Sequence, residues 1–246
     1  MPAGANRRRR EVTAARTRTT SAAVRGARHR GATWRDARTR TQKSERIRSA
    51  LLAAAADVVG QVGYAEASIS LITQRAGVAQ GTFYNYFESR QDIFDQLLPA
   101  LGAQMQAHVA EYARAGANFA EREQRSFVAF FSYLKKSPRF LRILNEAEYF
   151  APAAYAQHFD AVTRRYLAFL KRWHAKGEFA AYTEQELEEI VFILMAARSY
   201  LARYVVAEGE HGIPESVVRT YMNFVLHGLK GAPADDKQRA RPTRGK

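Results

Sequence analysis

The hydrophobic positions after residue 44 recur every three or four residues, which is the period of a helix buried along one face. The first such stripe consists of Ile47, Leu51, Ala55, Val58, Val59 and Val62. Gly63 follows the stripe at the position where a glycine with positive φ ends many helices. The pattern therefore predicts a helix from about Ser44 to Gly63.

Two short helices separated by a sharp turn are predicted next. Ser68 can cap the first one by accepting a hydrogen bond from a free backbone amide. Its inner face would consist of Ile69, Ile72 and Ala76. Gly77 provides the turn, Val78 fills the space between the helices, and the second helix is expected over residues 80–87.

A longer helix should begin after Ser89, which can cap it together with Asp92 three residues later. Pro99 falls inside this helix and has no amide to bond the carbonyl of Asp95, so we expect a bend or a break there. Further helices are expected over residues 104–115, 120–136, 138–150, 153–176, 184–206 and 214–229. No strand pattern stands out, so the chain is predicted to be all-α, with a three-helix N-terminal head and a larger helical body.

The positive charge is concentrated at the two ends of the chain. The 246 residues carry a net charge of +14. Residues 1–43 hold 13 Lys or Arg against 2 Asp or Glu, whereas residues 44–229 hold 19 against 20. Basic segments this poor in apolar residues are usually disordered and often touch nucleic acid. We expect a disordered basic arm over 1–43 and a disordered basic tail over 231–246; translation starting further downstream is an alternative explanation of the arm.

The composition excludes several kinds of site. The chain has no Cys, which removes disulfides, thiolate metal sites and cysteine nucleophiles and suits a reducing cytoplasm. No apolar run reaches the roughly 20 residues that span a bilayer. The six His are scattered, and there is no HExxH, G-x-S-x-G or P-loop motif, so we expect no enzyme, no metal and no cofactor.

Residues 44–101 resemble the DNA-binding head of the TetR/AcrR transcriptional regulators. The resemblance rests on Gly77-Val78, Thr82-Phe83-Tyr84, Tyr86-Phe87, Ser89-Arg90 and Ile93-Phe94. It implies a cytoplasmic homodimer that binds double-stranded DNA, bound to the nucleoid when active, and acts as a repressor released from a palindromic operator by a small ligand. It divides the chain into a helix-turn-helix domain over 44–91 and a ligand-binding and dimerisation domain over 92–230.

The family's DNA contacts, carried over to this sequence, fall on Ser68, Ser70, Ala79, Gln80, Gly81, Thr82, Tyr84, Tyr86 and Arg90. Gln80 would read a base, since an amide can pair bidentately with adenine. Ala79 and Gly81 would let the backbone approach the groove. The side chains at positions 68, 84, 86 and 90 would hold phosphates, which fix the register without reading sequence.

Two details of the head are predicted beside these contacts. Phe83 and Phe87 should pack inside the head rather than face DNA. Thr73 stands where the family usually has a small alanine, and its hydroxyl should bond the carbonyl of Ile69.

The resemblance also implies a dimer built from the last two helices. One apolar stripe consists of Leu187, Ile190, Val191, Leu194, Arg198, Leu201 and Val205. The other consists of Val217, Val218, Tyr221, Phe224, Val225 and Leu229. Two copies could bury both stripes in a four-helix interface, and packing inside one monomer is the alternative.

Residues 119–204 hold 18 of the 28 aromatic residues, which could line an apolar pocket or fill a solid core. The candidate pocket residues are Phe127, Phe131, Tyr149, Phe150, Phe159, Tyr166, Phe169 and Arg198. An unpaired Arg198 would be costly on an apolar stripe, so we favour an internal salt bridge, with Glu146 or Glu148, over an anionic ligand or a dimer contact. A fatty acid, an acyl thioester or an aromatic compound would suit such a pocket.

Two other DNA-binding functions stay open at this point. An architectural or weakly specific DNA-binding protein dominated by its basic arms would show a steep salt dependence that disappears with residues 1–43. An activator would use the same head as a repressor.

Overall fold

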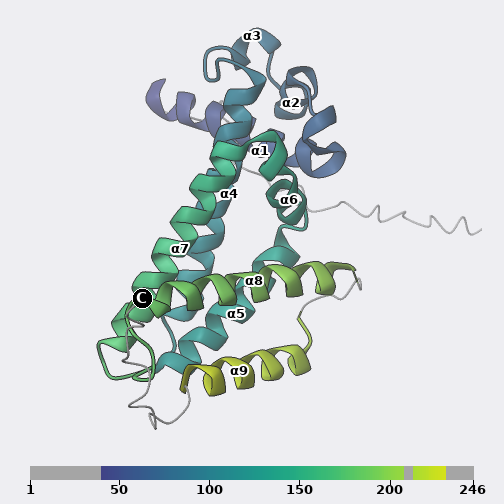
Figure 1. Cartoon of the computed structure of the whole chain (residues 1–246). Helices are drawn as coiled ribbons and strands as arrows, with labels where there is room; N and C mark the ends of the chain where they lie inside the picture. The colour runs from purple at the N-terminus through teal and green to yellow at the C-terminus, as the bar shows by residue number, and fades with distance from the viewer. Residues whose placement is uncertain (1–39, 208–212, 231–246) are drawn as a thin grey trace, which may run out of the picture.

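The computed structural model describes residues 40–207 and 213–230, and the regular structure in these ranges is all helical, as predicted. The helices are α1 (Arg40–Glu66), α2 (Ile69–Ala76), α3 (Gln80–Phe83), α4 (Arg90–Ala113), α5 (Phe119–Lys136), α6 (Phe140–Phe150), α7 (Pro152–His174), α8 (Glu186–Ala207) and α9 (Glu215–Lys230). In Figure 1, α1–α3 form a head, α4 and α7 lead away from it, and α8 and α9 lie at the far end of the body. Within the described ranges, no helix has both the length and the apolar character needed to cross a membrane.

Helix α1 begins earlier than the sequence pattern suggested. Residues 40–43 are helical, although they were expected to belong to the basic arm. These residues are polar, so they add nothing to the hydrophobic stripe from which the start at Ser44 was inferred. Residues 1–39 and 231–246, which hold the rest of the expected arm and tail, lie outside the described residues. Gly63 has a φ of 87° and interrupts the helical geometry as expected, and one more turn then runs to Glu66.

Helix α4 runs through Pro99 without a break. The helix is continuous from Arg90 to Ala113, so the predicted break is wrong and the helix expected over 104–115 is the second half of α4. Leu97, Leu98 and Met105, on both sides of the proline, are buried in the core. This packing holds the helix together where one backbone hydrogen bond is missing.

The head is closed by the caps and core contacts that the sequence predicted. Ser68 Oγ accepts from the amide of Leu71 at 3.2 Å, and the hydroxyl of Thr73 donates to the carbonyl of Ile69 at 2.9 Å. Phe83 and Phe87 are buried with ring centroids 5.5 Å apart. These contacts fix α2 and α3 against α1 and the start of α4.

Helix α6 joins the head to the body. Glu146 accepts from the backbone amide of Tyr64 at 2.8 Å and from Arg142 at 2.7 Å, and Arg142 also donates to the carbonyl of Gln61. The close approach needs Gly63, where an added Cβ would lie 2.8 Å from both the Arg142 guanidinium and the Glu146 carboxylate. The opposite face of α6 carries Phe140 into the core of the body.

Gly77 is a direct test of the turn between α2 and α3. Its φ of 69° and ψ of 34° lie in the left-handed region, and an added Cβ would meet nothing within 4 Å. Gly77→Ala should therefore lower the free energy of unfolding through backbone strain alone, by about 1–2 kcal/mol. Urea denaturation of the full chain measures this.

Gly81→Ala is the matched control. Gly81 lies in α3 with ordinary helical geometry and an equally open surrounding, so alanine should leave stability unchanged or raise it by up to about 1 kcal/mol. An equal loss of stability in both variants would contradict a left-handed turn at Gly77.

Candidate nucleic-acid interface and ligand cavity

The residues expected to face DNA lie together on the exposed end of the head, on α2, α3, the turn between them and the start of α4 (Figure 1). The exposed members of this set are Ser70, Ala79, Gln80, Gly81 and Tyr84. The half-buried members are Ser68, Thr82, Tyr86 and Arg90. The head thus presents one polar, glycine-containing helix, which is the form of element that enters a major groove.

Helix α3 is shorter than the helix expected over residues 80–87. Regular α-helix covers only Gln80–Phe83, and two backbone bonds to the carbonyl of Phe83, from Tyr86 at 2.9 Å and Phe87 at 3.1 Å, then close a tight turn. This turn leaves Tyr84 55% exposed while the neighbouring Phe83 is fully buried. The buried rings hold the turn, and Tyr84 is left at the surface.

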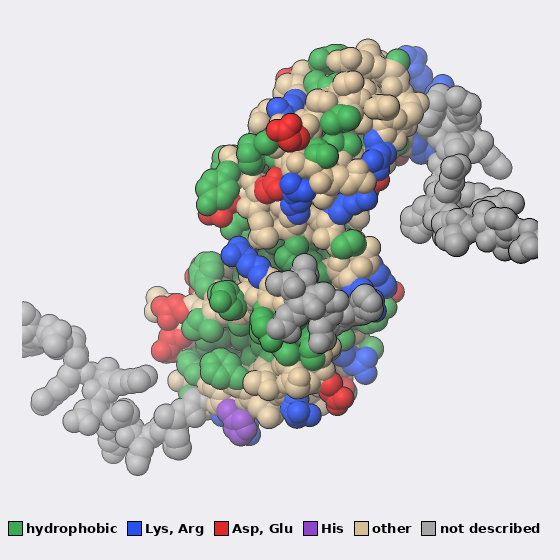
Figure 2. All heavy atoms as spheres, turned by 90° about the vertical axis from the view of Figure 1, so that its right-hand side faces the viewer, with side chains coloured by type: hydrophobic (Ala, Val, Ile, Leu, Met, Phe, Trp, Pro, Cys, Tyr) green, Lys and Arg blue, Asp and Glu red, His purple; other side chains and the backbone are tan. Residues whose placement is uncertain are grey.

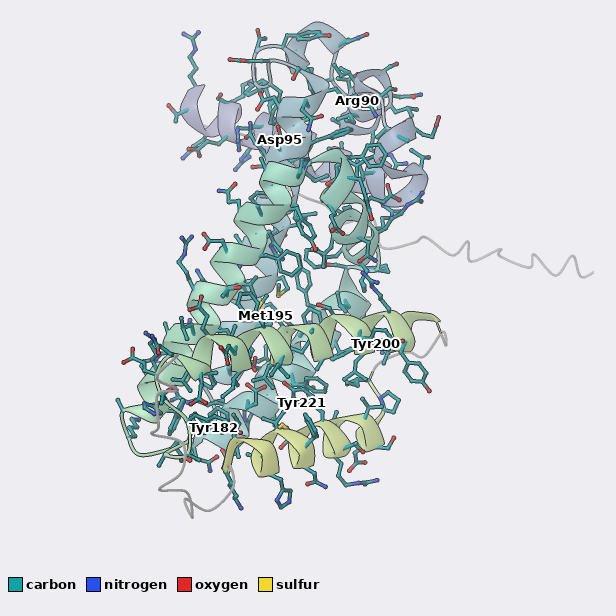
Figure 3. All side chains as sticks on the ribbon, in the orientation of Figure 1. Arg90, Asp95, Tyr182, Met195, Tyr200 and Tyr221 are labelled. Atoms are coloured by element: carbon teal, nitrogen blue, oxygen red, sulfur yellow. The ribbon has the colours of Figure 1, made fainter. Side chains whose placement is uncertain are left out.

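Arg90 has a structural role that the sequence did not predict. Its guanidinium donates to the carbonyls of Tyr64 and Ala65, the latter at 2.8 Å, and lies over the ring of Phe94 at 5.0 Å. Figure 3 marks Arg90 within the head. The side chain therefore covers backbone carbonyls at the end of α1, a contact that depends on how α4 meets α1 and that residue spacing does not encode. Its expected phosphate contact stays a prediction.

Two further amide side chains are exposed on the head and were not among the predicted contacts. Gln74 and Asn85 are exposed, one on α2 and one directly after α3. Amide groups can pair with adenine in the major groove, as proposed for Gln80. The only signal in the sequence was the residue type.

The body contains a cavity of about 390 Å³ between α4, α5, α6, α7 and α8. Four of the predicted pocket residues line it, namely Phe159, Tyr166, Phe169 and Arg198. The other four do not. Phe127 and Phe131 are buried in the core, and their rings pack on each other at 5.0 Å. Tyr149 and Phe150 lie exposed on α6, where Phe150 stacks on Tyr64 of the head at 5.9 Å. Helical spacing gave the face of each helix but not which aromatic residues bordered a void.

A second cavity of about 370 Å³ adjoins the first between α6, α7 and α8. The two share the lining residues Phe130, Leu144, Phe159, Met195 and Ser199. Met195, labelled in Figure 3, lies in the middle of α8. These shared side chains form the partition between the cavities.

Arg198 is held by an internal salt bridge, although not with the predicted partner. Its guanidinium donates to Glu123 at 2.7 Å and to Ser126 at 3.1 Å, whereas Glu146 pairs with Arg142 beside the end of α1. Glu123 is fully buried and also accepts from the hydroxyls of Tyr166 and Tyr221, at 2.7 and 2.8 Å. Glu146 and Glu148 were predicted only because they interrupt an aromatic helix; the contact with α5 required the fold.

The tyrosines of this network stay neutral. Burial raises the pKa of Tyr221 to about 12 against the opposing effect of Arg198, and it raises the pKa of Tyr166 well above 10. Figure 3 shows Tyr221 between α9 and α8. The network therefore joins α5, α7, α8 and α9 through one paired charge and two hydroxyls in the cavity wall.

His158 is the other buried polar residue of the cavity lining. It is 4% exposed and packs on α4 at Gly102, where an added Cβ would lie 2.1 Å from Nδ1. Nδ1 has no hydrogen-bond partner among the described residues. Burial lowers the pKa of this imidazole to about 4, so it is neutral near pH 7. Among the described residues, no group of His, Asp or Glu is arranged to hold a metal ion.

The apolar stripes predicted for a dimer pack mainly inside the monomer. Leu187, Val191 and Leu194 of α8 are buried, as are Val218 and Val225 of α9. Phe224 of the predicted α9 stripe is exposed, as are Phe192, Ile193 and Tyr200 of α8, which lie outside the predicted α8 stripe. Figure 2 shows hydrophobic side chains gathered over this end of the body.

The fold and the exposed head define the class of helix-turn-helix proteins that carry a helical second domain. Residues 51–97 match the family model described as bacterial regulatory proteins, tetR family. The helix-turn-helix transcriptional regulator YhgD of Bacillus subtilis is 24% identical over 121 residues, 49% of this chain and 63% of that protein. The chain thus spans less than two thirds of this relative.

Solved structures agree with the fold of the whole described chain. A TetR-family regulator from Syntrophomonas wolfei is 20% identical with a TM-score of 0.64, covering 78% of this chain and 99% of its own. The fatty acid degradation regulator FadR from Bacillus halodurans is 18% identical with a TM-score of 0.62, covering 73% and 94%. The head thus matches the tetR family model, and the described residues share the fold of the solved TetR-family regulators.

The lowered pKa of His158 predicts a pH dependence of stability. In the unfolded chain the imidazole titrates near its ordinary pKa of 6.5, so between about pH 6.5 and 4 the unfolded state binds more protons and stability falls as pH falls. Between pH 7 and pH 5 this group alone should remove about 2 kcal/mol. Urea titrations at the two pH values should show that His158→Gln reduces the difference by this amount.

His227 provides the control, because it is exposed on α9. His227→Gln should leave the pH dependence as it is in the unmodified chain. If His158→Gln behaved in the same way as His227→Gln, His158 would not be buried in its neutral form.

Proposed function

We propose that this protein is a ligand-responsive, homodimeric transcriptional repressor that binds an operator through the surface of α2 and α3. The observation that carries the proposal is that an exposed helix-turn-helix head is joined to a body containing a cavity, through the continuous helix α4 and through α6, which is clamped to the end of α1. The match to TetR-family regulators supports the same function. Such a repressor acts where DNA is, so we place it in the cytoplasm.

Base reading is assigned to Gln80, and close backbone approach to Ala79 and Gly81. All three are exposed at the start of α3. Tyr84 supplies a hydroxyl at the rim of this surface, and Ser70 a second one from α2. Hydroxyl contacts to phosphates position the head, whereas the amide of Gln80 discriminates between bases.

Effector binding is assigned to the cavity. Phe140 and Leu144 of α6 line it, while Arg142 and Glu146 of the same helix hold the end of α1. A ligand that favours another position of α6 would change the position of the head, and hence the spacing of two heads on an operator. The Bacillus halodurans relative is a fatty acid degradation regulator, which supports an apolar or amphipathic effector.

The dimer is assigned to the exposed surface of α8 and α9. Phe192, Ile193, Tyr200 and Phe224 are between 55% and 75% exposed, and hydrophobic side chains gather over this end of the body (Figure 2). A second copy would cover them and place two heads on half-sites about 34 Å apart.

Operator selection from random DNA tests the function and the assigned readers. Gln80→Ala should relax selection at one or two base pairs by about 1–3 kcal/mol each. Tyr84→Phe should weaken binding to all sequences equally, by about 1 kcal/mol, because one phosphate hydrogen bond is lost.

Gln124→Ala, an exposed glutamine on α5, is the matched control and should select the same operator as the unmodified chain. Selection of no preferred sequence by the unmodified chain would overturn the proposal in favour of an architectural DNA-binding protein. Uniform weakening by Gln80→Ala would reassign the reading residue.

Disruption of the dimer surface should separate the two protomers, and with them their two DNA-binding heads. The variant Tyr200→Lys/Phe224→Lys should be monomeric by light scattering after size exclusion and should lose on the order of a hundredfold in affinity for a two-half-site operator. Tyr149→Lys changes an equally exposed tyrosine outside this surface and should remain dimeric. Dissociation of the Tyr149 variant, or persistence of the dimer in the double variant, would place the interface elsewhere.

A further inference from the structure

The cavity is elongated and runs away from the head. Helices α4 and α7 are parallel along it: Gln91 near the start of α4 bonds the carbonyl of Phe150 just before α7, and Gly102 then packs on His158. The lining continues along α7 from His158 to Arg172, which at 1.5 Å per residue is about 21 Å. Such a shape fits an extended molecule better than a round one.

Four arginines line the half of the cavity that lies away from the head. Arg114 at the end of α4, Arg122 of α5 and Arg165 and Arg172 of α7 all line it. Arg122 bonds the carbonyl of Gly116, whereas the structure describes no ion pair for the other three. Glu111, one turn before Arg114, is exposed and does not line the cavity. Three exposed guanidinium groups without a carboxylate among them favour an anion.

Arg198 is not part of this cationic group, because its charge is already satisfied. Its guanidinium nitrogens bond Glu123, Ser126 and Tyr221. Between the arginines and His158 the lining is mostly apolar, with Val109, Phe130, Phe159 and Val162, and Phe169 lies between Arg165 and Arg172. The cavity thus has one cationic end and an apolar length.

The second cavity adjoins the apolar end. The partition contains Phe159 and Met195, and Ser199 is its smallest side chain. Methionine is flexible and adapts its shape to a neighbour. A chain that enters between the arginines and follows α7 therefore meets this partition at its far end.

We propose that the effector is an extended amphiphile. Its anionic head group binds Arg114, Arg165 and Arg172, and its apolar chain passes the Met195 partition into the second cavity. The inference rests on the proposed function, since it names the ligand class of that cavity. A free fatty acid and an acyl thioester of a phosphate-bearing carrier share this chemistry. An uncharged apolar or aromatic compound does not.

Calorimetric measurement of ligand binding to the full chain, without DNA, tests the assignment of the ligand's anionic head group. The probes are myristate, myristoyl-coenzyme A and tetradecan-1-ol, which share one chain length. Arg165→Gln/Arg172→Gln should weaken an anionic probe about tenfold or more and leave the alcohol unchanged. Arg125→Gln/Arg219→Gln, two exposed arginines outside the cavity lining, is the matched control and should bind as the unmodified chain does.

Each outcome decides the proposal. An effect confined to myristate identifies a carboxylate head, and one confined to the thioester identifies a phosphate-bearing head. Equal affinity for the alcohol, equal behaviour of both double variants, or no binding of any probe would overturn the inference. Because the readout needs no operator, these results are separate from the selection experiment, which decides the proposed function by itself.

Chain length tests the passage between the cavities. The unmodified chain should prefer myristate to octanoate, and Ser199→Phe, which narrows the partition, should weaken myristate about tenfold while octanoate is unaffected. Circular dichroism and thermal unfolding establish that this variant is folded. An unchanged ratio of the two affinities in a folded Ser199→Phe variant would confine the chain to the first cavity.

Discussion

The double contact of α6 is the constraint on which the rest of the structure depends. One face of this eleven-residue helix carries Phe140 and Leu144 to the cavity, and the other carries Arg142 and Glu146 to the end of α1. Glu146 bonds an arginine and a backbone amide at once, so the carboxylate fixes the helix rather than only neutralising a charge. A displacement of α6 therefore cannot be absorbed inside the body without changing contacts of the head.

The cavity wall that includes Tyr166 and Arg198 is held in a different way. Glu123, which is itself fully buried, gathers Arg198, Tyr166 and Tyr221 around one carboxylate oxygen. A buried ion pair of this kind contributes little net stability against an apolar core of the same volume, but breaking it is costly. It therefore holds α5, α7, α8 and α9 in one arrangement.

The sequence predicted the helices well because their apolar faces repeat with a regular period, and it predicted the caps at Ser68 and Ser89 because those depend on local spacing. It failed where two distant segments meet. The pairing of Arg198 with Glu123 and the contact of Arg90 with the end of α1 join residues 75 and about 25 positions apart. The sequence also did not show which aromatic residues border a cavity. Phe127 and Phe130 lie three residues apart on α5, yet only Phe130 borders one.

Pro99 has a consequence for motion as well as for helix geometry. Helix α4 belongs to both parts of the protein, with Phe94 in the core of the head and Met105 in the cavity lining. Between them, the carbonyl of Asp95 has no proline amide to bond, so bending α4 at this turn breaks one backbone hydrogen bond fewer than bending it elsewhere. The proline thus provides a hinge in the longest element shared by head and body, with the continuous core packing as its restoring force.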